Sequence, residues 1–408
     1  MKDNSLVPVN EIWYITTDGE PVELGYRIRT EIVSHTYEEG KGVIVFKEPV
    51  TSIGGLLRYF DSLREVAIPE SVTEIGDDAF RHCSSLQEMI IPEGVTRIGD
   101  WAFGGCTSLQ KIVIPSSVKE IGLLAFSNCT GLQEVVISEG VASIGQDAFR
   151  GCTGLREIFV PSTVTSIRVG AFCDCSNLAK ITVEEGNPKY DSREGCNAII
   201  AKRTDALMCG CMNTVIPSSV TAIREGAFKG HTSLREVVIP EGVTRIESWA
   251  FNGCTSLREI IIPEGVTRIE SWAFEGCTGL LKVVIPSSIT AINKAAFNGC
   301  AGLCNIVIPE GVTEIGDWAF KGCTGLREIV IPDGVKSIGQ WAFNMCSYLE
   351  IVHLPVGVSK IETDSFTNCR KLKAIYIPKK KVAYYKNRFP RNKHWLIVEE
   401  GSDLPVKP

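Results

Sequence analysis

Cysteine has the widest chemical potential of any residue type in this chain, which holds sixteen cysteines but only five histidines among its 408 residues. Cysteine thiols can form disulfides, bind zinc or act as nucleophiles. Eleven of them recur every 23 residues on either side of one ten-residue insertion, at Cys83, Cys106, Cys129, Cys152, Cys175, Cys254, Cys277, Cys300, Cys323, Cys346 and Cys369. His231 occupies a twelfth position of the series. Such regular spacing indicates a structural column.

The geometry of a stacked column argues against systematic disulfides. Equivalent residues of neighbouring repeats are close enough by Cα separation, but their parallel side chains do not present facing Cβ atoms. We therefore expect a ladder of buried thiols that act as small apolar side chains. The state of the five other cysteines stays open, and these are Cys173, Cys196, Cys209, Cys211 and Cys304.

The two Cys-x-Cys pairs that flank the insertion leave a zinc site open as an alternative. They are Cys173 with Cys175 and Cys209 with Cys211. Zinc ligands usually follow Cys-x(2–4)-Cys spacing, and no histidine is near these pairs. We therefore expect no bound metal.

No other residue pattern is typical of catalysis. The histidines (His35, His82, His231, His353 and His394) are scattered, without a serine, aspartate or cysteine partner pattern, and no phosphate-binding glycine motif occurs. We expect a protein that is not an enzyme and has no cofactor.

Composition excludes several classes of protein. Apolar residues make up 44% and charged residues 22% of the chain, which is typical of a folded globular protein and too apolar for a disordered one. A net charge of -6 argues against a general nucleic-acid binder. No apolar run is long enough to span a bilayer, and residues 1–11 lack the apolar core of a signal peptide.

The elements that must position these residues come from one repeat. Residues 240–262 and 263–285 are identical at seventeen of 23 positions. Twelve full units begin at Pro69, Pro92, Pro115, Ser138, Pro161, Pro217, Pro240, Pro263, Pro286, Pro309, Pro332 and Pro355, with a shortened unit from Pro49 to Ile68 before them and a stretched unit at 184–216. A period of this length indicates a solenoid.

One unit can be interpreted physically. In a strand, Val237 and Ile239 point to one side while Glu236 and Val238 point to the other, and Pro240 ends the strand because it has no N–H. A glycine turn and two inward apolar residues follow. The Ala-Phe pair then begins a short helical or 3₁₀ turn. A coil of this size cannot bury its apolar face alone, so we expect equivalent strands to stack about 4.8 Å apart.

The pattern L-x-x-V-x-I-P-x-x-V-x-x-I-x-x-x-A-F-x-x-C-x-x-L resembles the leucine-rich repeats of BspA-like proteins, also called the Treponema pallidum type. The resemblance implies a right-handed leucine-rich repeat solenoid, with a parallel β-sheet on the concave face and short strands and 3₁₀ or helical turns on the other. Many relatives are bacterial surface proteins that bind host proteins or other bacteria. The stretched unit, with Asn187-Pro188 and Cys196 to Ile200, also resembles an elongated unit of that family.

The array needs caps at both ends, because an open end exposes apolar core and an unpaired strand. We predict an N-terminal β-hairpin cap at 1–48 that turns at Asp18-Gly19, with Trp13–Ile15 and Val22–Leu24 as strands and a further strand at Val43–Phe46. The solenoid occupies 49–378 as a single array, with a hairpin at 184–216 formed by 197–202 and 206–211. A C-terminal cap and tail at 379–408 contain a short helix at 382–389 and a last strand at 395–398.

The outward positions of the repeat strands are the predicted partner-binding surface. One column is largely apolar, and a second column two residues earlier is mostly charged. Exposed apolar patches tend to mark interaction sites, although strand propensity alone is an alternative explanation of these residues. The candidate residues are Val136, Phe159, Glu236, Val238, Glu259, Ile261, Val284, Val307, Val330 and His353.

Two other surfaces leave alternatives open. Five of the seven tryptophans share a column at Trp101, Trp249, Trp272, Trp318 and Trp341, where we expect ring stacking and carbohydrate binding is the alternative. Ten lysines and arginines lie between Arg370 and Lys393 with no acidic residue, which suits a solvated cap or an anionic polymer or membrane surface.

These observations favour a non-enzymatic scaffold that binds a protein partner of unknown identity, and we expect it to be a monomer. The resemblance implies adhesion or partner recognition at the bacterial cell surface or after secretion. The absence of a signal peptide and the many free thiols leave a mature fragment or a cytoplasmic protein as alternatives.

Overall fold

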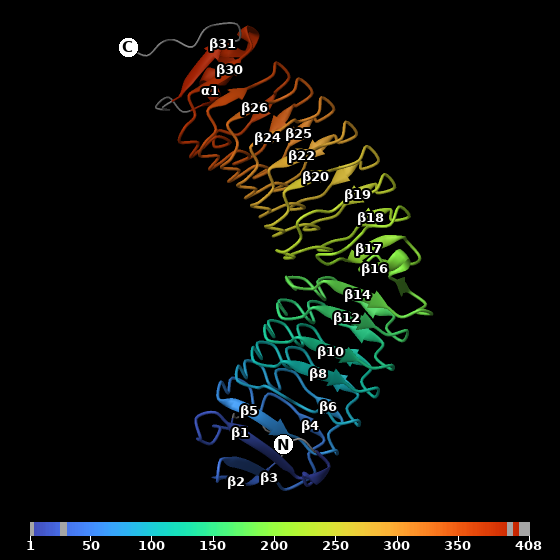
Figure 1. Ribbon diagram of the computed structural model, residues 1–408. Helices are drawn as coiled ribbons and strands as arrows, with labels where there is room; N and C mark the ends of the chain where they lie inside the picture. Colours follow the sequence, from blue (N-terminus) through green and yellow to red (C-terminus); the bar gives the residue numbers. More distant parts are fainter. Residues whose placement is uncertain (1–3, 25–30, 390–394, 400–408) are drawn as a thin grey trace. The chain divides into compact units, whose positions relative to one another are not determined.

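The computed structural model describes residues 4–24, 31–389 and 395–399 (Figure 1). The described chain is a β-solenoid built from the predicted repeats. It forms two compact units, which we call unit 1 (1–203 with 209–214) and unit 2 (204–208 with 215–408). The sequence predicts one array, and the repeat does continue through both units. The division falls within the stretched unit at 184–216, where the stacking of equal coils is interrupted.

Most coils contribute one strand from the V-x-I segment, which we call the repeat strand, although the segments around Ile90 and Val238 form none. In unit 1 these are β5 (Leu63–Ala67), β8 (Lys111–Ile114), β10 (Glu134–Ile137), β12 (Glu157–Val160) and β14 (Lys180–Val183). In unit 2 they are β20 (Glu259–Ile261), β22 (Lys282–Val284), β24 (Asn305–Ile306), β26 (Glu328–Val330), β28 (Ile351–His353) and β30 (Ala374–Ile377). Neighbours that pair are parallel and in register, so that Ile261 lies beside Val284.

A second column of two-residue strands follows the turn after each proline. In unit 1 these short strands are β4 (Ser52–Ile53), β6 (Glu74–Ile75), β7 (Arg97–Ile98), β9 (Glu120–Ile121), β11 (Ser143–Ile144) and β13 (Ser166–Ile167), and they form one parallel sheet. In unit 2 they are β18 (Ala222–Ile223), β19 (Arg245–Ile246), β21 (Arg268–Ile269), β23 (Ala291–Ile292), β25 (Glu314–Ile315), β27 (Ser337–Ile338) and β29 (Lys360–Ile361).

The core of each unit is a stack of identical side chains. The phenylalanine of each Ala-Phe pair lies nearly parallel to the next, as in Phe103 and Phe126, whose ring centroids are 5.0 Å apart. The backbone at this point is also laddered, because the Phe103 N–H donates to the carbonyl of Ala125 in the following coil. Stacked, buried rings supply apolar contact between coils that a single coil cannot provide by itself.

The turn around the Ala-Phe pair is not a 3₁₀ helix in any of the described repeats. Its two ends adopt left-handed backbone conformations, as at Trp249 (φ +56°) and Gly253 (φ +73°). A residue with positive φ cannot continue a right-handed helix. The sequence expectation of a short helical turn is therefore replaced by a tight, non-helical turn.

The N-terminal cap differs from the predicted hairpin. Strand β1 (Glu11–Thr16) pairs antiparallel with β3 (Lys41–Phe46) and with β5 of the shortened first unit, and β2 (Ile32–Glu38) joins β3. The hairpin turns at Glu39-Gly40, both with positive φ, rather than at Asp18-Gly19. Val22–Leu24 form no strand, and Pro21 before them has no N–H to donate to a ladder. A 3₁₀ turn, η1 (Asn4–Leu6), precedes this sheet.

The stretched unit contains the two predicted strands, β16 (Ile199–Ala201) and β17 (Ala206–Cys209), together with β15 (Tyr190–Asp191) and the 3₁₀ turn η2 (Arg193–Gly195). Asn187 is fully buried and organises the bend: its amide nitrogen donates to the carbonyls of Pro161 and Val164, and its side-chain oxygen accepts from the N–H groups of Lys189 and Tyr190.

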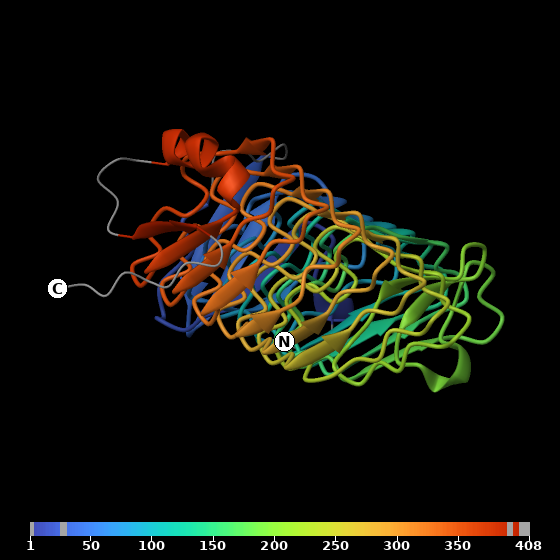
Figure 2. The same ribbon diagram turned by 90° about the horizontal axis from the view of Figure 1, so that it is seen from above.

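The C-terminal end of unit 2 is covered by η3 (Lys379–Lys381), α1 (Val382–Arg388) and β31 (Leu396–Glu399), which pairs parallel with β30. Figure 2 shows α1 beside the last coils, where the Tyr385 hydroxyl donates to the carbonyl of Pro355 at 2.8 Å. The predicted helix at 382–389 and strand at 395–398 are present within one residue of their expected bounds. Residues 390–394 and 400–408 of the predicted cap and tail lie outside the described residues.

Candidate functional site

The outward side chains of the repeat strands form the surface that the sequence predicts for partner binding. We call the column beginning at Ile90 the apolar stripe. In unit 1 it contains Ile90, Val113, Val136, Phe159 and Thr182, and in unit 2 Val238, Ile261, Val284, Val307, Val330, His353 and Tyr376. Every member is exposed or half-buried, whereas the flanking Val237 and Ile239 are buried. The alternation of the strand therefore separates core from surface as predicted.

Exposure within the apolar stripe is largest in unit 2. Val238 is 82% exposed and Val307 is 74% exposed. Large aliphatic side chains at this exposure lose the hydrophobic stabilisation that burial gives, about 25 cal/mol per Å² of apolar surface. A continuous row of such residues is consequently unfavourable in water unless another surface covers it.

The column two residues earlier, which we call the proximal row, is charged and partly self-paired. Lys111 lies 2.7 Å from Glu134, Lys282 lies 2.5 Å from Glu259, and Lys180 lies 3.7 Å from Glu157. These exposed pairs join adjacent coils and contribute little to stability. Their arrangement neutralises part of the row and leaves Glu236 without an ion pair to any described residue.

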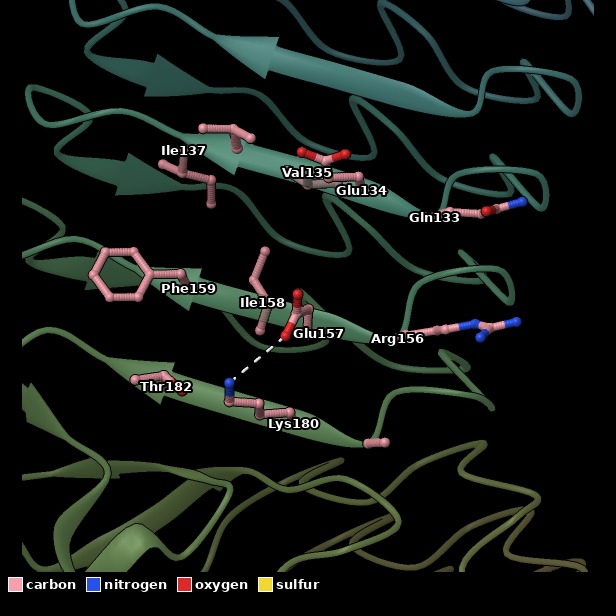
Figure 3. A pocket seen from close by; sticks show the side chains of 12 residues that line it. Gln133, Glu134, Val135, Ile137, Arg156, Glu157, Ile158, Phe159, Lys180 and Thr182 are labelled. Carbon is pink, nitrogen blue, oxygen red and sulfur yellow. Dashed lines mark ion pairs between the residues drawn. The ribbon is translucent and has the colours of Figure 1, made fainter.

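The exposed faces of unit 1 contain a groove of about 900 Å³ over β10, β12 and β14 (Figure 3). Its walls include two of the predicted binding residues, Val136 and Phe159, and the ion pair between Glu157 and Lys180. In Figure 3 the Phe159 ring lies at one end of the groove and Arg156 extends at the other. The groove combines an aromatic side chain with charges of both signs.

This groove coincides with a break in the sheet. Strand β10 pairs with β8 and β12 pairs with β14, but the described residues form no ladder between β10 and β12. In a parallel ladder, each residue directs both its N–H and its C=O to the same neighbouring strand, and successive residues alternate between the two neighbours. By this rule the backbone groups of Val135 and Ile137 in β10, and of Phe159 in β12, face the break between these two strands. Backbone polar groups at these edges remain available to water or to a ligand.

A similar groove of about 490 Å³ lies on unit 2, again at a break in the repeat-strand ladder, between β24 and β26. Its lining includes the predicted residues Val307 and Val330, with Cys304, Arg327 and Glu328. At the unit 2 break the repeats on both sides follow the consensus, so their sequences contain no signal for it. At the unit 1 break, Ser138 follows β10 where the other full units have proline.

The apolar stripe ends in an aromatic pair near the C-terminal cap. The rings of His353 and Tyr376 are stacked, with centroids 4.9 Å apart, and His353 Nε2 lies 3.2 Å from a carboxylate oxygen of Glu328. Of the ten predicted site residues, Val136 and Phe159 belong to unit 1. The other eight, Glu236 and Glu259 among them, belong to unit 2.

Four of the five tryptophans of the column form two stacked pairs. Trp249 and Trp272 stack with centroids 5.0 Å apart, and Trp318 and Trp341 stack at 6.0 Å. Ala295 interrupts the column between these pairs, and there the Lys294 ammonium lies 5.4 Å from one ring (Trp272) and 4.7 Å from the other (Trp318). Neighbouring rings and lysines thus cover the aromatic faces, which favours stacking over a platform for sugars.

The cysteine column is buried as predicted, and all sixteen cysteines are free thiols, with Cys304 alone exposed. Burial raises the pKa of the Cys277 and Cys369 thiols to about 12. In the described part of the chain, no three histidine, cysteine, aspartate or glutamate residues lie where they could hold a metal ion. The zinc alternative for the paired cysteines therefore finds no ligand set there.

The basic C-terminal segment is partly engaged with the solenoid. Lys371 lies 4.1 Å from the ring centroid of Tyr348, and Lys373 pairs with Glu350. Arg391 and Lys393 lie outside the described residues. Among the helices that the structure describes, none is long and apolar enough to cross a bilayer.

The sequence matches the family described as the BspA type leucine rich repeat region over residues 51–183, 207–327 and 277–394, which is more than half of the chain. Among curated proteins, none matches the chain.

Solved structures from several bacteria are similar to this chain. A leucine-rich cell surface protein from Faecalibacterium prausnitzii is 27% identical, with 87% of this chain and 88% of that protein covered and a TM-score of 0.54. A leucine-rich repeat protein from Bacteroides ovatus is 26% identical, with 92% and 100% covered and a TM-score of 0.51. The pneumococcal vaccine antigen PcpA is 20% identical, with 87% and 85% covered and a TM-score of 0.63, which reflects a shared fold.

Proposed function

Because the chain belongs to the BspA-type leucine-rich repeat family, we propose that it is a non-enzymatic scaffold that binds a protein partner through the apolar stripe. The similarity to a bacterial leucine-rich cell surface protein, at 27% identity, supports a location at the cell surface. We infer adhesion to, or recognition of, a host or bacterial protein.

The main support for the proposal is that residues of the apolar stripe are exposed at positions where no strand forms. Strand propensity would explain a row of valine and isoleucine on a regular sheet. Val238, however, lies in a segment (233–239) without an assigned strand and is 82% exposed, and Val307 lies just beyond the end of β24. At these positions the strand propensity of valine does not stabilise a sheet. Covering by a partner would account for it.

The experiment compares three forms of the full chain as bait for surface proteins extracted from bacterial and epithelial cells. The stripe variant carries Val238→Asp, Ile261→Asp and Val284→Asp. The control variant carries Thr232→Asp, Thr255→Asp and Thr278→Asp, which are exposed threonines on the same three coils. Both variants add the same charge, so a general electrostatic effect would change them equally.

We expect proteins captured by the unmodified chain to be retained by the control variant and lost from the stripe variant. Cross-links in the captured complexes should map to the repeat-strand face. Equal capture by the stripe variant would refute the proposal.

A further inference from the structure

The unit 2 face has a second row of acidic residues on the other side of the apolar stripe. In the five coils that begin at Pro240, Pro263, Pro286, Pro309 and Pro332, the residue after the proline lies at the corner that follows the repeat strand. We call these five residues the distal row: Glu241, Glu264, Ser287, Glu310 and Asp333. All four acidic side chains are exposed. The distal row contains no lysine or arginine.

The acidic residues of the distal row lack cationic partners. Among the described residues, no lysine or arginine forms an ion pair with Glu241, Glu264, Glu310 or Asp333, although Glu264 accepts hydrogen bonds from Ser287. In the proximal row Glu259 is already paired with Lys282. Arg235 and Arg258 come one residue before Glu236 and Glu259 of the proximal row, and so lie farther from the stripe than that row does. The uncompensated negative charge therefore lies mainly along the distal row.

The width of this surface fits one α-helix. Five residue steps separate Glu236 from Glu241, or at most about 16 Å of strand. An α-helix with its side chains is about 10–12 Å in diameter, so a helix over the apolar stripe would lie between the two rows.

The spacing along the stripe selects a helix over a strand. Where the repeat strands are paired, from β20 to β24, successive coils place apolar side chains about 4.8 Å apart, and a helix places them on one face about every 5.4 Å, a difference of only about 0.6 Å per coil. A strand laid along the same line repeats on one face about every 6.7 Å and loses register within two coils. The segment from Val238 to Val330 covers four steps between coils, which at this spacing is at least about 19 Å, or roughly 13 helical residues.

We propose that the unit 2 face binds a cationic amphipathic α-helix, which lies along the apolar stripe from Val238 to Val330 with lysine or arginine against the distal row. This inference rests on the proposed function and specifies the partner's chemistry. An amphipathic helix has an apolar face about 100° wide, which matches a stripe one residue wide that is bounded on its distal side by acidic side chains. Charge complementarity would set the orientation and speed the association.

The test uses synthetic amphipathic peptides of about 14 residues as probes. One contains leucine and lysine, the second replaces every lysine with glutamate, and the third is the lysine peptide with a central proline that prevents the helix. Fluorescence anisotropy measures their affinity for the full chain and three variants. The serine variant is Ile261→Ser/Val284→Ser, the row variant is Glu241→Gln/Glu310→Gln/Asp333→Asn, and the control is Thr255→Ala/Thr278→Ala.

We expect the lysine helix to bind at least about tenfold more tightly than the glutamate and proline peptides, given the apolar and charged contacts involved. The serine variant should weaken that binding about tenfold. The row variant should weaken it and reduce its salt dependence, while the control should not change it.

Two results would overturn the inference in distinguishable ways. If the glutamate or proline peptide binds as well as the lysine helix and depends on Ile261 and Val284, the cationic helix is wrong while the stripe remains a binding surface. If the lysine helix binds the serine variant with unchanged affinity, the attraction is purely electrostatic, and both the inference and the role of the apolar stripe fail.

Discussion

The thiol of Cys277 donates a hydrogen bond to the backbone carbonyl of Phe251, with 3.0 Å between sulfur and oxygen. The same bond joins each of the eleven column cysteines to the carbonyl 26 residues earlier, including Cys83 with Leu57 in the shortened first unit. Each thiol thereby ties one coil to the previous one. The column is a structural device of the solenoid, and its regularity explains the unusual cysteine content.

The eleven thiols of the cysteine column should be chemically inert in the folded protein. Burial raises the pKa of Cys277 to about 12, so that at pH 8 the reactive thiolate is a very small fraction. Iodoacetamide should label one thiol per native chain, Cys304, and all sixteen after urea denaturation, as counted by mass spectrometry. A Cys304→Ser variant should show almost no native labelling. Rapid labelling of several column cysteines would contradict the buried ladder.

Replacement of Trp272 by glycine should destabilise the protein less than replacement by alanine. Its φ of +59° is unfavourable for any residue with a Cβ, and its ring stacks on Trp249. Both substitutions lose the stack, but only glycine releases the backbone strain, so Trp272→Gly should be about 1 kcal/mol more stable than Trp272→Ala in urea denaturation. At Thr255, where φ is not positive, the order should reverse. A less stable glycine variant at 272 would refute the left-handed assignment.

Gly42 should be intolerant of any side chain. A Cβ there would lie 1.9 Å from Cζ of the buried Tyr14, whose hydroxyl lies 2.6 Å from His35 Nε2 and accepts from the Val22 N–H. Gly42→Ala should destabilise the N-terminal cap by about 1–3 kcal/mol, measured by urea denaturation. Gly54→Ala is the matched control, since a Cβ there has no atom within 4 Å. Equal stability of the two variants would show that the cap is packed differently.

The stripe variant with Val238→Asp, Ile261→Asp and Val284→Asp should fold normally. These side chains are exposed and make little contribution to the core, so surface substitutions should change stability by less than about 0.5 kcal/mol each. Circular dichroism and the melting midpoint should match those of the threonine control. A large loss of stability would mean that the apolar stripe supports the fold, as strand propensity would require.

Sequence patterns predicted the features that one repeat determines by itself. Alternation at Val237, Val238 and Ile239 separated core from surface, and the period placed the cysteine, phenylalanine and tryptophan columns. Each of these predictions depends only on the sequence within one coil, and stacking then repeats the same structure in the other coils.

Features that depend on neighbouring segments were not predictable in this way. Asp18-Gly19 forms a turn, but Pro21 prevents the next segment from pairing, and the hairpin forms at Glu39-Gly40, which lacks the usual sequence signal. The positive φ at Trp249 was hidden because tryptophan rarely adopts it. The groove at Val307 lies at a break between coils whose sequences both follow the consensus.

The most direct test of the central claim places a photo-cross-linking amino acid at position 261 in one form of the chain and at position 255 in another. Both positions are exposed and lie on the same coil, one in the apolar stripe and one outside it. After incubation with surface proteins and irradiation, position 261 should form a covalent adduct with a partner protein that position 255 does not form. Adducts of that partner from position 255 but not from position 261 would contradict binding through the apolar stripe.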